Sequence, residues 1–128
     1  MDIVTRKQIN ILIRLAESDK HFSSLERDRI FEIAAKHNFP EEDVKDLIRN
    51  PEPIESFGAL SDNQKFEYLK TAIELMLIDR KIFETEIKFC QNLALKLGFN
   101  KNAVDFVQDQ IGHLSNEELK TALFNKFA

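Results

Sequence analysis

The sequence predicts an all-α protein, a compact bundle of about seven helices built from two repeated helical units and a C-terminal helix. Apolar residues recur at helical spacing in seven segments, and no segment shows the alternation of a half-buried strand. Only three glycines and three prolines interrupt the 128 residues. The units span residues about 2–50 and 62–110, and we expect residues 1–128 to form a single helical domain.

Composition and charge narrow the functional classes. Hydrophobic residues make up 43% and charged residues 31% of the chain, and the net charge is −4 without a basic stripe. We therefore expect no binding to nucleic acid. Neither a signal segment nor an apolar run of about 18 residues is present, so we expect a cytoplasmic protein without a transmembrane segment. Peripheral association with a membrane stays open. Cys90 is the only cysteine and lies in an apolar helical pattern, which favours a place in the core.

The first unit begins with a helix over about residues 3–18, for which Asp2 is a suitable N-cap. A second helix follows Ser23, because Ser23 and Glu26 have the spacing of a capping box. It ends near Asn38, a residue that tolerates the left-handed conformation at a helix terminus.

Pro40 opens a short third helix, with acidic residues near its positive end. Residues 49–60 contain two prolines and a glycine and connect the two units. We expect this connection to be ordered and to pack through Ile54, Phe57 and Leu60.

The central helix begins after Ser61, which has capping-box spacing with Gln64. Its apolar residues cover most of its circumference, so it should be the most buried helix. A fifth helix over residues 84–97 ends at Gly98, and Asn100 is expected to cap a sixth.

Ser115 and Glu118 have capping-box spacing and begin the C-terminal helix. Three phenylalanines lie off the inward-facing stripes, namely Phe83, Phe106 and Phe124. If they were exposed together, they would mark a surface for a partner protein.

A shift of sixty residues aligns the two units. The equivalent pairs are Ile13 with Ile73, Leu15 with Leu75, Asp19 with Asp79, Glu26 with Glu86, Ala34 with Ala94, Lys36 with Lys96, Phe39 with Phe99 and Val44 with Val104. A unit this small cannot bury its own apolar face. We therefore expect the units to pack about an approximate two-fold axis, with the central helix against the first. Arg14 and Glu74, equivalent but opposite in charge, should approach one another or flank the seam.

On these residues the chain resembles the TerB-like family, the tellurite-resistance type of all-helical domain also found in membrane-anchored J-domain co-chaperones. The family pattern is a small residue, Asp three positions on, Gly, an apolar residue, and Glu seven positions after the Asp. It stands here as Ala16, Asp19, Lys20, Phe22 and Glu26, and again as Met76, Asp79, Arg80, Ile82 and Glu86. Lys20 and Arg80 occupy the Gly positions. The resemblance implies a non-enzymatic module that binds another protein, with links to stress response and metal-ion sensing.

The two-fold arrangement would bring Asp19, Glu26, Asp79 and Glu86 toward one edge. Two carboxylates about 5 Å apart repel by roughly 3 kcal/mol at an effective dielectric near 20, so a positive group is needed between them. Ca²⁺ or Mg²⁺ would suit the oxygen ligands. The basic residues of the two turns, Lys20, Arg80 and Lys81, would serve equally.

A second interpretation needs no ion and no cofactor: each Asp accepts backbone N–H groups in its turn, and each Glu closes a capping box. The alternative functional class is a small metal-dependent or acid–base enzyme that uses the same four residues. A buried cleft beside them with raised pKa values would favour the enzyme, whereas an open edge would favour the module.

Overall fold

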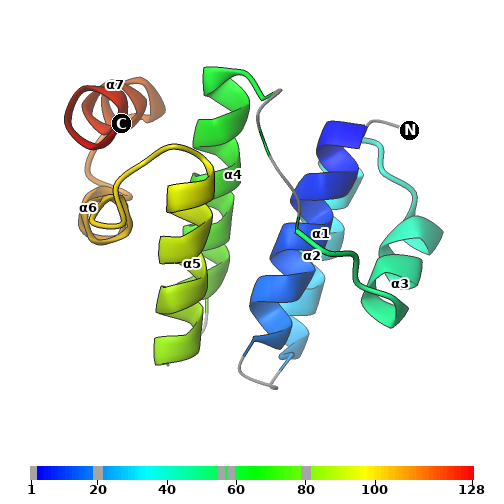
Figure 1. Cartoon of the computed structure of the whole chain (residues 1–128). Helices are drawn as coiled ribbons and strands as arrows, with labels where there is room; N and C mark the ends of the chain where they lie inside the picture. The colour runs from blue at the N-terminus through cyan, green and yellow to red at the C-terminus, as the bar shows by residue number, and fades with distance from the viewer. Residues whose placement is uncertain (1–2, 19–21, 55–56, 58–59, 79–81) are drawn as a thin grey trace.

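The computed structural model describes residues 3–18, 22–54, 57, 60–78 and 82–128. Over this part of the chain it contains seven α-helices and no β-strand, which confirms the all-α class (Figure 1). The helices are α1 (Ile3–Glu17), α2 (Ser24–Lys36), α3 (Glu41–Arg49), α4 (Asp62–Met76), α5 (Glu84–Lys96), α6 (Ala103–Gln110) and α7 (Asn116–Phe127).

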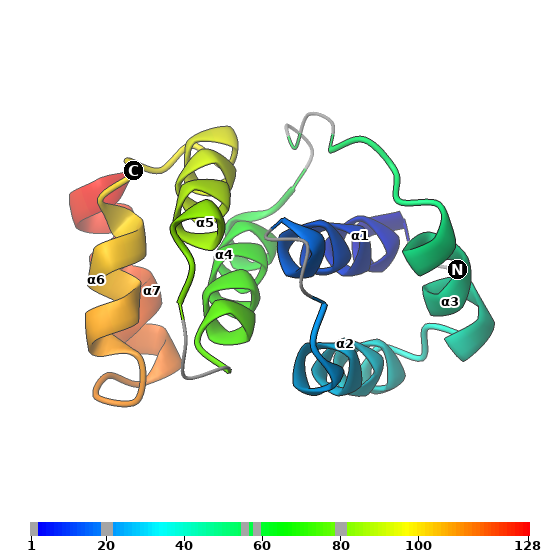
Figure 2. The same ribbon diagram turned by 90° about the horizontal axis from the view of Figure 1, so that it is seen from below.

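The helices form two similar groups that meet at the centre of the molecule. In the first group α1 contacts α2 and α3, and α2 contacts α3; in the second, α4, α5 and α6 make the equivalent contacts. The groups join where α1 packs against α4, and α7 packs on α6 at the outer side (Figures 1 and 2). The predicted pair of repeated helical units is therefore present, with the central helix on the first.

The two central helices run in the same direction. The Gln8 Nε2 donates to Thr71 Oγ1 at 3.1 Å, and the Tyr68 hydroxyl donates to the carbonyl of Val4. From Val4 to Gln8 the contacts advance by one turn along α1, and from Tyr68 to Thr71 they advance by about one turn along α4 in the same direction. Consequently, the last turns of α1 and α4 and the first turns of α2 and α5 gather at one end of the bundle, the lower end in Figure 1. We call this end the turn end.

The core repeats with the helices. In α2 and α5 the buried positions are identical after the shift of sixty: Glu26, Ile30, Ile33 and Ala34, and then Glu86, Cys90, Leu93 and Ala94. Along the seam of α1 and α4 the equivalent buried residues are Ile9 and Leu69, Leu12 and Ala72, Ile13 and Ile73, Leu15 and Leu75, and Ala16 and Met76. Both units bury their apolar faces in one continuous core.

Three predicted N-terminal caps are confirmed. The hydroxyl groups of Ser23, Ser61 and Ser115 accept from the backbone N–H three residues on, at 3.2, 3.2 and 3.1 Å. Each bond satisfies a donor that the first turn of a helix leaves without a partner. Asp2, the cap predicted for α1, lies outside the described residues.

The predicted helix ends at Asn38 and Gly98 are also confirmed, with φ values of +56° and +90°. After each of them the next residue donates back into the helix: Phe39 N–H to the carbonyl of Ala34 at 2.9 Å, and Phe99 N–H to that of Ala94 at 2.8 Å. This is the Schellman arrangement, which needs one left-handed residue and turns an apolar side chain inward.

The predicted starts of α3 and α6 need correction. Pro40 precedes α3 in an extended conformation instead of forming its first residue. Asn100 does not cap α6, which begins at Ala103. Its side chain accepts from Asn102 N–H at 2.9 Å and closes a turn before the helix, and its own N–H donates to the carbonyl of Phe127 at 2.6 Å. Asparagine readily forms such local turns in place of a cap.

The connection between the units packs as predicted. Phe57 is buried, and its ring meets that of Tyr68 edge-on with 5.9 Å between centroids. Ile54 and Leu60 are partly buried against the core.

The proposed aromatic surface does not form, because Phe83, Phe106 and Phe124 are all half-buried. The ring of Phe106 packs on Phe127 and that of Phe124 on Phe99, each with 5.0 Å between centroids. Both contacts hold α7 to the second unit.

The Gly98 position offers a test of the repeated helix ending. An added Cβ at Gly98 would meet no atom within 4 Å, so its cost is conformational and not steric. Gly98→Ala should lower the free energy of unfolding by about 1–2 kcal/mol, because Ala disfavours positive φ. Gly98→Asn, the residue at the equivalent position 38, should cost clearly less. Urea unfolding measures both, and equal costs would contradict the assignment.

Candidate functional site

The structure describes two of the four acidic residues predicted to form a site. Asp19 and Asp79 lie outside the described residues. Glu26 and Glu86 occupy the third positions of α2 and α5, and both lie at the turn end. Their exposed fractions are only 3% and 4%. Carboxylates this buried need compensating hydrogen bonds.

Helix capping supplies those bonds. Glu26 Oε1 accepts from the backbone N–H of Ser23 at 3.1 Å and from its hydroxyl at 2.9 Å. Glu86 Oε1 accepts from the backbone N–H of Phe83 at 3.3 Å. Since Phe83 has no side-chain acceptor, the second unit carries only the half of the capping box that Glu86 provides. The predicted capping role is therefore confirmed fully for Glu26 and in half for Glu86.

Cys90 lies one turn after Glu86 and is buried, as predicted. Burial, and to a lesser extent the negative charge of Glu86, raises the pKa of the Cys90 thiol from 9.0 to about 12. The thiol is therefore protonated at neutral pH and is a packing group, not a nucleophile.

The described part of the chain holds no group of three His, Cys, Asp or Glu side chains placed as metal ligands would be. A metal at the turn end would thus require Asp19 or Asp79. Among the described residues there is also no helix with the length and hydropathy to cross a membrane.

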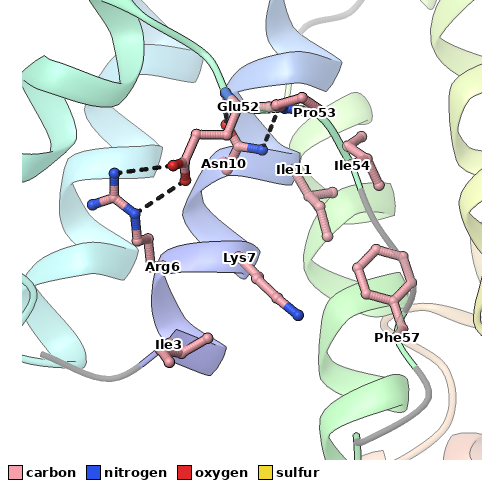
Figure 3. Close-up of a pocket in the computed structure, with 9 residues that line it drawn as sticks. All are labelled: Ile3, Arg6, Lys7, Asn10, Ile11, Glu52, Pro53, Ile54 and Phe57. Atoms are coloured by element: carbon pink, nitrogen blue, oxygen red, sulfur yellow. Dashed lines mark hydrogen bonds and ion pairs between the residues drawn. The ribbon is translucent and has the colours of Figure 1, made fainter.

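A second polar feature fixes the connection to α1. The Asn10 side chain, 4% exposed, donates through Nδ2 to the carbonyl of Glu52 at 2.9 Å and accepts from the N–H of Glu52 at 2.8 Å. The Glu52 carboxylate accepts from Arg6 at 3.0 and 3.3 Å (Figure 3). One buried amide thereby satisfies both backbone groups of a residue outside any helix, and it holds the connection across the outer face of α1.

Two cavities lie along the held connection and share Pro53 and Ile54. The first, about 260 Å³, is the connection pocket in Figure 3, lined by Ile3, Arg6, Lys7, Asn10, Ile11, Glu52, Pro53, Ile54 and Phe57. The second, about 400 Å³, is lined by Arg14, Pro53, Ile54, Phe89, Asn92, Leu93 and Lys96. We call it the α1–α5 groove.

The α1–α5 groove has an apolar base and a cationic rim. Leu93 is buried, and Ile54 and Phe89 are half-buried, whereas Arg14 and Lys96 are exposed. Volumes of this size are typical of ligand sites. The groove was not predicted from the sequence, because its residues come from α1, the connection and α5, which are distant in the chain.

Arg14 and Glu74, predicted to approach one another or to flank the seam, form no ion pair with each other. Glu74 Oε2 instead lies 3.6 Å from the Nζ of Lys70 in the same helix, and Arg14 lines the groove. Both residues lie on the two helices that form the seam.

Comparison of the chain with protein-family models, with curated proteins and with solved structures gave no match. The likeness to the TerB-like family therefore depends on the motif around the two turns.

The two hydrogen bonds between the Asn10 side chain and the backbone of Glu52, which we call the Asn10 clamp, predict a specific loss of stability. Asn10→Ala should lower the free energy of unfolding by about 2 kcal/mol, because it leaves two backbone groups without their partner. Arg6→Ala, which removes an ion pair that is partly exposed, should cost less than about 1 kcal/mol. Chemical denaturation of both variants is the measurement, and an equal or larger cost at Arg6 would refute the clamp.

The raised pKa of Cys90 predicts a pH dependence. The unfolded thiol loses its proton near pH 9.0 and the folded thiol only near 12. The contribution of the buried thiol to the free energy of unfolding is therefore complete below pH 9.0 and declines between pH 9.0 and about 12. The decline is about 1.4 kcal/mol per pH unit. Stability of the wild type should therefore fall more steeply than that of Cys90→Ala above pH 9.0, as urea unfolding would measure. Parallel curves would contradict the burial of the thiol.

Proposed function

We propose that this chain is a non-enzymatic interaction module of the TerB-like type, which acts in the cytoplasm in a stress response by binding another protein. The observation that carries the proposal is the duplicated turn end. There, Glu26 and Glu86 are buried at equivalent positions of α2 and α5, and each follows a turn that contains an aspartate in the family pattern.

The chemistry of the described cavities supports binding in preference to catalysis. Glu26 and Glu86 line neither the α1–α5 groove nor the connection pocket. Both carboxylates accept from backbone N–H groups at their helix starts, which is a structural use of the charge. The lining of the groove consists of apolar, amide and cationic side chains, which suit the recognition of a partner.

The turn end is also where such a module would sense a divalent cation. Carboxylates of Asp19, Glu26, Asp79 and Glu86 would offer the oxygen ligands that Ca²⁺ and Mg²⁺ prefer. The competing source of positive charge is the chain itself, because Lys20 and Arg80 occupy the positions of the family's glycines.

Calorimetric titration tests the cation-sensing part. If the turn end binds Ca²⁺ or Mg²⁺, the wild type should release or absorb heat on titration, and the double variant Asp19→Asn with Asp79→Asn should lose that heat. Zn²⁺ serves as a softer comparison ion, which an all-oxygen site should not prefer.

A matched control separates the site from general charge. Glu42→Gln with Asp43→Asn also removes two acids, from the first turn of α3, and should leave the heat unchanged. Absence of heat in the wild type, or heat that survives the substitution of both turn aspartates, would retire cation sensing at the turn end.

A further inference from the structure

The two units agree in their core but differ at the α1–α5 groove. On α5, Phe89 and Asn92 line the groove, and the equivalent positions on α2 hold Arg29 and Glu32. The buried residue that follows them is apolar in both units, Leu93 in one and Ile33 in the other. At these positions the divergence therefore affects half-buried and exposed residues, whereas the buried residue stays apolar.

The charge of the groove also differs from that of the equivalent positions in the other unit. The positions equivalent to the groove carry two cations and two acids, and there Arg29 pairs with Glu32 at 3.6 Å and Glu74 with Lys70 at 3.6 Å. The described lining of the groove carries Arg14 and Lys96 and no acid. Among the described residues, neither of these two cations forms an ion pair. A chain with a net charge of −4 thus presents two cations beside apolar side chains at one concave place.

From this divergence we infer that the α1–α5 groove binds an acidic peptide segment of a partner protein, one that carries a large aliphatic or aromatic side chain. The inference rests on the proposed function, since it names the partner class of the interaction module. The apolar side chain of the segment inserts over Leu93 between Phe89 and Ile54. Its flanking carboxylates pair with the guanidinium of Arg14 and the ammonium of Lys96, and the Arg14 pair can be bidentate.

The shape of the groove favours a peptide over the other anionic partners. A cavity of about 400 Å³ with a buried leucine at its base accepts an inserted side chain. A membrane surface instead engages protruding apolar residues, and a nucleic acid needs a longer run of cations than two. The clamp of Asn10 on Glu52 holds Pro53 and Ile54 in place, so one wall exists before the partner arrives. Such preorganisation lowers the cost of binding.

The test is a selection from a displayed library of random peptides of about 12 residues, long enough for roughly three helical turns. The wild-type chain should enrich sequences with an excess of Asp and Glu around a large apolar residue. Fluorescence anisotropy then gives the affinity of the most enriched peptide. Arg14→Glu with Lys96→Glu should weaken that affinity at least about tenfold, because it reverses both cations at the rim.

The control variant is Lys36→Glu with Lys101→Glu, which changes the net charge equally and includes the residue equivalent to Lys96. It should change the affinity by less than about threefold, the scale of a distant charge screened by salt. Circular dichroism checks that each variant folds.

Enriched peptides without excess acid, or an affinity that both double variants change equally, would overturn the assignment of the groove. Binding of the wild type to anionic lipid vesicles, with no peptide enriched, would overturn it in favour of a membrane partner. If the enriched peptide is acidic but its affinity is unchanged by the Arg14 and Lys96 substitutions, the groove is not its binding site. The proposed interaction module would not be contradicted by that result. Cation binding at the turn end is measured separately by calorimetry.

Discussion

The packing of α1 against α4 is the constraint on which the rest of the structure depends. Each helix contributes side chains that are fully buried at the seam, with Ile13 and Ile73 as the equivalent pair. Burial of each such side chain is worth about 1.5–3 kcal/mol. Because the two helices run in the same direction, the seam also places Glu26 and Glu86, in the first turns of α2 and α5, at the same end of the bundle.

The two units share an apolar core but differ at polar positions of α1 and α4. Asn10 holds the connection, whereas the equivalent position in α4 is Lys70, which pairs with Glu74. One face of α1 is thereby committed to a segment that has no counterpart in the second unit. The α1–α5 groove lies along this segment, so a concave surface with two cations forms where the two units differ. Packing constrains the core residues of both units, whereas residues at the surface can diverge and take part in binding.

Much of the fold could be predicted from local sequence signals. Ser23, Ser61 and Ser115 mark helix starts because a hydroxyl can reach the N–H three residues on, and Asn38 and Gly98 mark ends because they accept positive φ. Asn100 gave a wrong helix start, since its side chain satisfies a turn and its N–H meets Phe127, which is distant in sequence. For the acidic set, spacing predicted the capping bonds of the glutamates. The groove depends on how the connection crosses α1, which is a tertiary property without a local signal.

Native-state hydrogen exchange, followed residue by residue, tests the central claim most directly. If the seam couples the units, backbone amides in the middle of α1 and α4 exchange only through global unfolding and share one free energy of opening. Amides of both helices should then respond equally to added denaturant. Exchange of α1 through a separate opening of lower free energy, while α4 and α5 stay protected, would show that the units are independent and would contradict the account.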